Sequence, residues 1–183
     1  MEKAEVLVWD VPTRLFHWLL ALSFAGAFLT AESERYRDVH VMLGYTVLGL
    51  GAVRLIWGLV GTRYARFWSF AYGPKSVLTY IKSLFTRSPQ HYLGHNPAGS
   101  WAIYALLAFS LLAGATGYAT YSDTGGHWME ETHEALANTL LAVVLVHIAG
   151  VLVSSLVHRE NLVRSMLTGY KSAKAPSVDR RPG

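Results

Sequence analysis

Four apolar stretches, each long enough to cross a lipid bilayer, limit what this chain can fold into. They occupy residues 14–31, 40–61, 100–121 and 132–157 of the 183-residue sequence. A helix needs about 20 largely apolar residues to span the hydrocarbon core of a membrane. Because backbone polar groups inside a bilayer must be satisfied within the protein, each stretch is expected to be helical. The sequence therefore predicts an all-α, integral membrane four-helix bundle.

The first apolar stretch could instead be a cleaved secretory signal, since its apolar core ends near Ala31. A signal peptide begins with a positively charged segment. The first 14 residues of this chain contain three acidic and two basic residues. This leader is typical of a retained transmembrane helix rather than a signal.

The charges between the stretches predict the orientation of the bundle. Residues 61–99 contain five Lys or Arg and no acidic residue, and residues 158–183 contain six Lys or Arg. Residues 122–132, in contrast, contain three acidic residues and no Lys or Arg. Because cytoplasmic loops carry an excess of Lys and Arg, both termini are expected to be cytoplasmic. Because the basic residues lie in the segments predicted to be cytoplasmic, we attribute the net charge of +4 to the membrane orientation. Membrane lipid is therefore an expected partner, and nucleic acid is not.

The long basic segment between the second and third stretches contains a further helical pattern. Pro74 suits the first position of a helix, and apolar residues recur on one face opposite Lys75 and Lys82. We expect an interfacial amphipathic helix on the inner leaflet, although an ordinary connecting helix fits the same pattern. The apolar face consists of Val77, Leu78, Ile81, Leu84 and Phe85.

The end of the chain has a different composition. Past Tyr170 the sequence is rich in Lys, Ser, Pro and Arg and has few apolar residues. We therefore predict one membrane domain over residues 1–171 and a disordered cytoplasmic tail over residues 172–183.

Cysteine is absent, which excludes disulfides, cysteine-ligated iron–sulfur clusters and covalently attached c-type haem. Four of the eight histidines lie in or at the ends of the predicted spans: His17, His40, His133 and His147. Histidine inside a membrane is costly and usually functional. The other four, which lie in loops or at helix ends, are expected to be structural or solvated.

The spacing of His133 and His147 in the fourth stretch suggests two sites. Fourteen helical residues turn through about 1400°, which is about 40° short of four turns, and rise about 21 Å. Both imidazoles thus face the bundle interior, one near each membrane surface. By depth, His40 pairs with His133 on the outer side and His17 with His147 on the inner side.

Paired histidines on facing helices are typical of six-coordinate haem, whereas pairs without carboxylate or thiolate are poor zinc or di-iron sites. Hydrogen bonds between helices remain an alternative role for any one of these histidines. Two arginines are candidate contacts for haem propionates. Arg54 lies in the inner part of the second stretch, and Arg14 lies near His17 at the inner end of the first. Arg35 and Arg37 are lesser candidates on the outer side.

Several segments carry a resemblance to a known family. They are residues 8–18 (VWDVPTRLFHW), His40 with residues 43–45 (LGY), residues 54–61 (RLIWGLVG) with 65–67 (ARF), residues 94–99 (GHNPAG), His133 with Glu134, His147 with Gly150 and Val151, and residues 166–171 (MLTGYK). In this order the chain resembles the bacterial cytochrome b561 family, in the branch related to the b-type cytochrome subunit of nickel–iron hydrogenases. The resemblance spans residues 8 to about 171.

The resemblance implies a bundle with two non-covalent haems b, axially ligated by His17 and His147 inside and by His40 and His133 outside. It also implies a location in the bacterial inner membrane. Electrons would be exchanged with membrane quinone near the inner haem and with an outer partner such as a periplasmic c-type cytochrome.

Three other functions stay open from the sequence. The chain could be the membrane anchor of a hydrogenase-like dehydrogenase, a superoxide:quinone oxidoreductase acting alone, or a haem-free scaffold or transporter. The outer segments carry six acidic residues against Arg35 and Arg37. This balance argues against steering of an anion such as superoxide and favours a basic partner.

Overall fold

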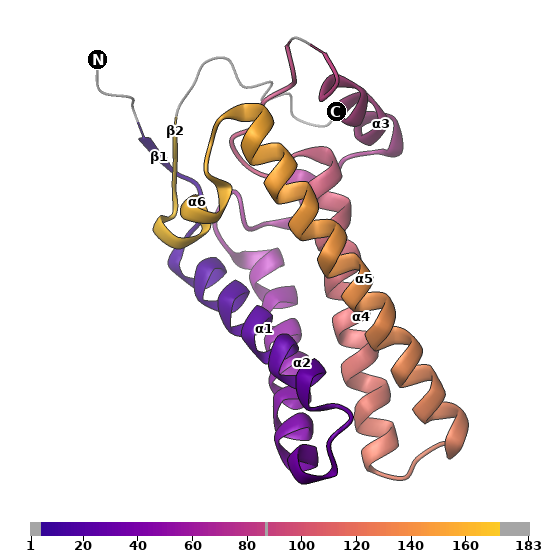
Figure 1. Ribbon diagram of the computed structural model, residues 1–183. Helices are drawn as coiled ribbons and strands as arrows, with labels where there is room; N and C mark the ends of the chain where they lie inside the picture. Colours follow the sequence, from indigo (N-terminus) through magenta and orange to yellow (C-terminus); the bar gives the residue numbers. More distant parts are fainter. Residues whose placement is uncertain (1–4, 87, 173–183) are drawn as a thin grey trace. The chain divides into compact units, whose positions relative to one another are not determined.

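The computed structural model describes residues 5–86 and 88–172, and most of its regular structure is helical (Figure 1). Four helices are long and apolar enough to cross a membrane, so the predicted all-α membrane bundle is confirmed. The orientation of the termini stays a prediction. The elements are β1 (Glu5–Leu7), α1 (Val11–Thr30), η1 (Glu34–Tyr36), α2 (Arg37–Val60), η2 (Phe67–Phe70), α3 (Pro74–Ser83), α4 (Pro97–Tyr121), α5 (His127–His158), α6 (Leu162–Thr168) and β2 (Tyr170–Ser172).

All four long helices begin earlier than their predicted apolar stretches, and polar residues contribute to their starts. The carboxylate of Asp10 accepts the backbone N–H of Thr13 at 2.8 Å and caps α1. The side chain of Asn96 accepts the N–H of Gly99 at 2.7 Å in the first turn of α4. The first turn of α5 contains His127, whose ring lies 3.6 Å from Glu130. Hydropathy alone does not detect these turns.

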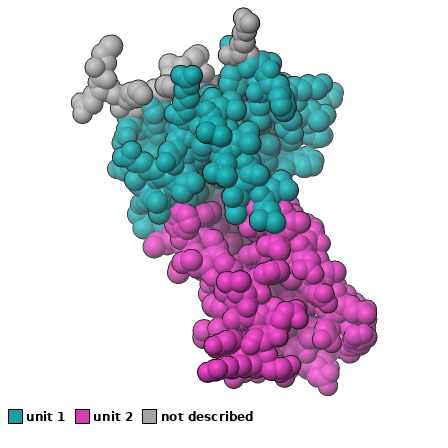
Figure 2. Space-filling model, viewed as in Figure 1, with its two compact units in different colours: residues 1–14, 57–104, 145–183 teal, residues 15–56, 105–144 magenta. Residues whose placement is uncertain are grey.

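The chain divides into two compact units (Figure 2). Unit 1 comprises residues 1–14, 57–104 and 145–183, and unit 2 comprises residues 15–56 and 105–144. Each of α1, α2, α4 and α5 contributes residues to both units. Unit 2 contains His17, His40 and His133, whereas unit 1 contains His147.

Unit 1 contains a small sheet that joins segments from the two ends of the chain. Strands β1 and β2 are antiparallel, with Val6 opposite Lys171. Gly169 precedes β2 at φ +91°, and a Cβ there would lie 2.6 Å from the carbonyl oxygen of Trp9. The position therefore requires glycine. Ser172, which we assigned to the tail, is the last residue of β2, and the rest of the predicted tail lies outside the described residues.

Helix α3 confirms the helix predicted in the basic segment. Tyr80 is buried, whereas Leu78 and Ile81 are exposed and Phe85, just beyond the helix, is 88% exposed. The apolar face is thus only partly covered by protein. Contact of this face with the inner leaflet stays a prediction.

Candidate functional site

The clearest candidate site in unit 2 is the pair formed by His40 of α2 and His133 of α5. Their ring centroids are 6.1 Å apart, and the ring planes are nearly perpendicular at 84°. Both side chains are half-buried. The predicted outer pair is therefore brought together by the fold.

Backbone carbonyls fix the chemical state of both rings. Nδ1 of His40 lies 2.8 Å from the carbonyl oxygen of Ala27, and Nδ1 of His133 lies 2.9 Å from that of Ala113. Because a carbonyl oxygen only accepts hydrogen bonds, each Nδ1 carries the hydrogen and donates it. In the neutral ring, Nε2 is then the nitrogen that carries the lone pair, and a hydrogen bond at the other ring nitrogen is usual for a metal-ligating imidazole.

The separation of the two rings fits a metal between them. Two metal–imidazole bonds of about 2 Å, with about 1.1 Å from each nitrogen to its ring centre, give centroids about 6 Å apart. The observed distance is 6.1 Å. The described residues contain no group of three or more His, Cys, Asp or Glu able to hold a metal ion. A pair of histidines with no third protein ligand fits an iron whose other ligands come from a haem macrocycle.

Two glycines shape the surroundings of this pair. A Cβ at Gly117 of α4 would lie 2.9 Å from Cε1 of His133, so the glycine gives the ring its room. A Cβ at Gly44, one turn after His40, would meet nothing within 4 Å. Space beside this turn suits the close approach of a flat cofactor. A Cβ at Gly114, in contrast, would lie 2.9 Å from the side chain of Leu48, which indicates close helix packing.

Replacement of Gly117 by valine is expected to lower occupancy of the outer site. The added atoms would displace the ring of His133, and overpacking of this kind costs about 1–3 kcal/mol. Since each 1.4 kcal/mol corresponds to about a tenfold change in affinity, the variant should bind its cofactor more weakly, and the ratio of haem to protein should fall measurably. Gly49→Val is the matched control, because a Cβ at Gly49 meets nothing within 4 Å. Equal haem content in the two variants would contradict the prediction.

The predicted inner pair consists of residues from different units. His17 lies on α1 and stacks edge to face on Trp18, with ring centroids 5.1 Å apart. His147 lies on α5, half-buried and 14 residues after His133 on the same continuous helix. The helix thus separates the two α5 histidines by about 21 Å. The pairing of His17 with His147 stays a prediction.

The two candidate propionate contacts have different surroundings. Arg54 is only 3% exposed, and its guanidinium lies 5.6 Å from the ring of Phe16, next to His17. A buried cation in a membrane helix suits an anionic neighbour such as a propionate. Arg14 instead donates a hydrogen bond of 2.5 Å from Nη1 to the carbonyl oxygen of Leu167, which lies near the end of α6. Propionate contacts of both arginines stay predictions.

The remaining histidines, which we expected to be structural or solvated, have different surroundings. His95 packs between Trp9 and Phe70, with ring centroids 4.6 and 4.3 Å away. The side chain of His127 is 79% exposed. His91 and His158 lie side by side in a polar cluster of unit 1.

Comparison with known proteins gives a consistent family. A family model described as prokaryotic cytochrome b561 matches residues 8–169. Relatives named probable Ni/Fe-hydrogenase B-type cytochrome subunits include one from Rhizobium leguminosarum bv. viciae, 24% identical over 95% of this chain and 92% of its own. One from Azotobacter vinelandii is 25% identical over 99% of this chain and 92% of its own length. A hydrogenase 1 subunit from Escherichia coli (strain K12) is 24% identical over 95% of this chain and 94% of its own length. No solved structure shows a significant match.

Proposed function

Because the chain belongs to the prokaryotic cytochrome b561 family, we propose that it carries electrons across the bacterial inner membrane through two haems b. It is a multi-pass b-type cytochrome. The haems would connect membrane quinone, on the inner side, with a redox partner on the outer side. The haem supplies one-electron chemistry at its iron, and its protein ligands and surroundings set the potential.

The outer pair is the observation that carries this proposal. The ring centroids of His40 and His133 are 6.1 Å apart, a separation at which the two side chains could hold an iron between them, and main-chain carbonyls lie within hydrogen-bond distance of both Nδ1 atoms. The side chains thus supply position and orientation in advance. His17 and His147 would hold the inner haem, which gives two redox centres along one path.

An acidic outer segment supports a basic protein partner. Glu130 and Glu131 at the start of α5 are 69% and 67% exposed. Complementary charge speeds association and orients a docking protein more than it adds affinity. A c-type cytochrome with a basic face fits this surface.

The test starts with the purified wild-type protein. A pyridine haemochrome assay is expected to give two haems b per chain, with a reduced-minus-oxidised spectrum that quinol can generate. The reduced protein should then pass electrons to a basic c-type cytochrome, at a rate that falls as salt is added. A protein without haem, or with a single haem, would contradict the two-haem proposal.

A second candidate is the membrane subunit of a hydrogenase-like dehydrogenase. Its support is the printed name of the relatives, which are hydrogenase cytochrome subunits. Purification through a tag on this chain from its own host would decide between the two. Recovery of a metal-containing dehydrogenase in stoichiometric amount would favour the second candidate.

A further inference from the structure

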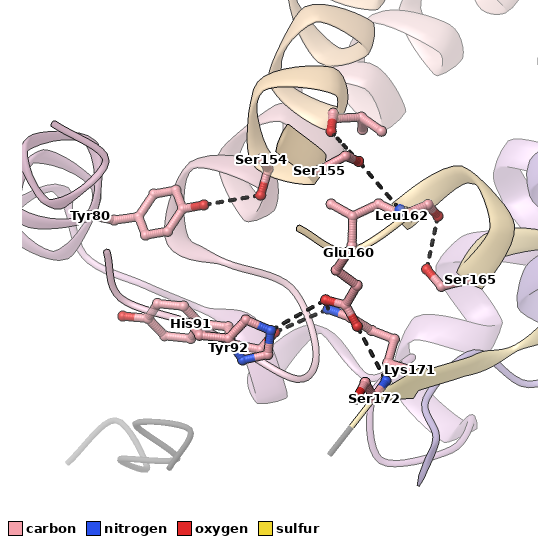
Figure 3. A network of polar contacts seen from close by, with 11 residues as sticks. Tyr80, His91, Tyr92, Ser154, Ser155, Glu160, Leu162, Ser165, Lys171 and Ser172 are labelled. Carbon is pink, nitrogen blue, oxygen red and sulfur yellow. Dashed lines mark hydrogen bonds and ion pairs between the residues drawn. The ribbon is translucent and has the colours of Figure 1, made fainter. Parts of the chain in front are cut away.

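A cluster of ionisable side chains surrounds Glu160 in unit 1 (Figure 3). Its carboxylate lies 3.3 Å from Nε2 of His91 and 3.4 Å from Nζ of Lys171, and it accepts the N–H of Ser172 at 3.3 Å. The ring of His158, the last residue of α5, lies edge to face on His91 at 5.3 Å. We call His91, His158, Glu160 and Lys171 the Glu160 cluster.

The cluster is too buried to be an ordinary surface ion pair. The side chains of Lys171 and Glu160 are 4% and 13% exposed, and that of His91 is 21% exposed. Buried ion pairs contribute little to stability, because desolvation offsets their attraction. An apolar contact would hold β2 in place equally well. Retention of four ionisable groups therefore points to a chemical role.

The contacts suit the exchange of protons at His91. Nζ of Lys171 also donates to the carbonyl oxygen of Tyr92 at 3.1 Å, so the lysine is fixed beside Glu160. Nε2 of His91 is hydrogen-bonded to the carboxylate of Glu160, whereas the buried Nδ1 of His91 has no hydrogen-bond partner among the described residues. A histidine can take up a proton at one ring nitrogen and release one from the other.

The protonation of the neighbouring groups agrees with this role. Burial raises the pKa of Glu160, but the hydrogen bond from His91 and the charge of Lys171 outweigh burial, and the net pKa is lowered. Burial lowers the pKa of Lys171, against the opposing effect of Glu160. Tyr92 and Tyr80 also face the cluster, and burial raises the pKa of both phenols. The charged form of Glu160 is therefore favoured beside His91 and Lys171.

One face of α5 leads from the cluster toward the predicted inner ligand. His158 follows His147 by 11 residues, which is three turns plus about 20° and a rise of about 16 Å. Ser154 lies on the same face two turns after His147, is buried, and its Oγ is 3.4 Å from the hydroxyl of Tyr80. A Cβ at Gly150, also near this face, would meet nothing within 4 Å. Between His158 and His147 this face therefore carries the buried hydroxyl of Ser154 and the open, exposed position of Gly150.

We propose that the Glu160 cluster is a proton-exchange site that serves quinone reduction at the inner end of the protein. The inference rests on the proposed function. Reduction of a quinone to a quinol takes two electrons, delivered through the haems, and two protons. Each protonated histidine would release one proton along the α5 face, return to its neutral form and be protonated again from solution.

The test compares two acceptors with different proton demands. Haem-loaded, full-length protein is reduced and then reoxidised in a stopped-flow instrument, by decylubiquinone or by ferricyanide, which takes an electron without a proton. Glu160→Gln and His91→Gln are expected to slow reoxidation by decylubiquinone at least about tenfold, as loss of a general acid does. Reoxidation by ferricyanide should not change. His127→Gln is the matched control, because this histidine is exposed and outside the cluster.

Infrared spectroscopy gives a readout that does not depend on quinone. The carboxyl band that disappears in Glu160→Gln identifies the protonated form of Glu160. His91→Gln removes a hydrogen bond that lowers the pKa of Glu160, so this band should appear at higher pH than in the wild type. An unshifted band would contradict the coupling of the two groups.

The possible outcomes separate the two proposals. A wild type that reacts with ferricyanide but not with decylubiquinone would overturn the proposed quinone function. A wild type that reacts with both, with variants that match it at every pH, would overturn the proton site alone. If Glu160→Gln loses haem, His91→Gln decides the question, since it leaves the contact between Glu160 and Lys171 in place.

Discussion

His133→Ala is expected to retain one haem b and to lose the outer one completely. The substitution would remove one of the two proposed haem ligands, and it also removes the ring that donates to the carbonyl of Ala113. The partner ring of His40, held on Ala27, cannot supply the second bond to the same iron. Haemochrome analysis should therefore give half the wild-type haem. Electron transfer to an outer partner should fall by several orders of magnitude while quinol still reduces the inner haem.

A second histidine of the same helix provides the control. His127 lies six residues earlier in α5 and its side chain is 79% exposed. His127→Ala should leave both haems and their spectra unchanged. Full haem content in His133→Ala would show that the 6.1 Å approach of the two rings is a packing contact and not a cofactor site.

Asp10→Ala is expected to destabilise the protein by about 2–3 kcal/mol, because the carboxylate has several partners. It accepts the N–H of Thr13 as the cap of α1, the indole N–H of Trp57 at 3.1 Å and the hydroxyl of Thr62 at 2.6 Å. Asp10→Asn should cost less, since an amide oxygen can still accept. The free energy of unfolding in mixed micelles measures the effect. Asp38→Ala, in the exposed first turn of α2, should change it little.

The same residue gives a pH dependence with a definite sign. Burial raises the pKa of Asp10, but hydrogen bonds from Thr13, Thr62 and Trp57 outweigh burial, so its folded pKa lies below the usual value for an aspartate. The charged form is therefore favoured by folding, and its stabilisation is fully present above the unfolded pKa. It should be lost as the pH falls through the folded pKa. Asp10→Asn should lack this part of the acid dependence.

The long helices were predictable because their signal is local and strong. A run of about 20 apolar residues can satisfy its backbone in a membrane only as a helix, and all four predicted runs are helices. The start of α4 at Pro97 was missed by three residues, since the polar cap at Asn96 lies outside the apolar run.

The small sheet and the Glu160 cluster could not be predicted from local patterns. Three-residue strands have no measurable periodicity, so β1 and β2 gave no signal. Lys171, the last residue of the predicted membrane domain, is 5% exposed, and no local pattern indicates that it is buried. His91 and Glu160 are 69 residues apart, and only the tertiary fold brings them together.

The candidate outer site was more accessible to reasoning from sequence. The depth of His40 and His133 in their helices was enough to pair them, and their rings are indeed neighbours. The carbonyls of Ala27 and Ala113 that orient these rings were not predicted, because every residue has a backbone carbonyl and the residue type does not show which one accepts a hydrogen bond. The pairing of His17 with His147 rests on the same reasoning and stays a prediction.

The pairing of β1 with β2 has a consequence for biosynthesis. Residues 5–7 leave the ribosome first, but their hydrogen-bonding partners are residues 170–172. At about 5–20 residues per second, the first strand waits roughly 8 to 30 seconds for the second to be made. All four spans are synthesised within that interval. The ladder can therefore form only after the last helix has been inserted, and its closure would mark the end of assembly.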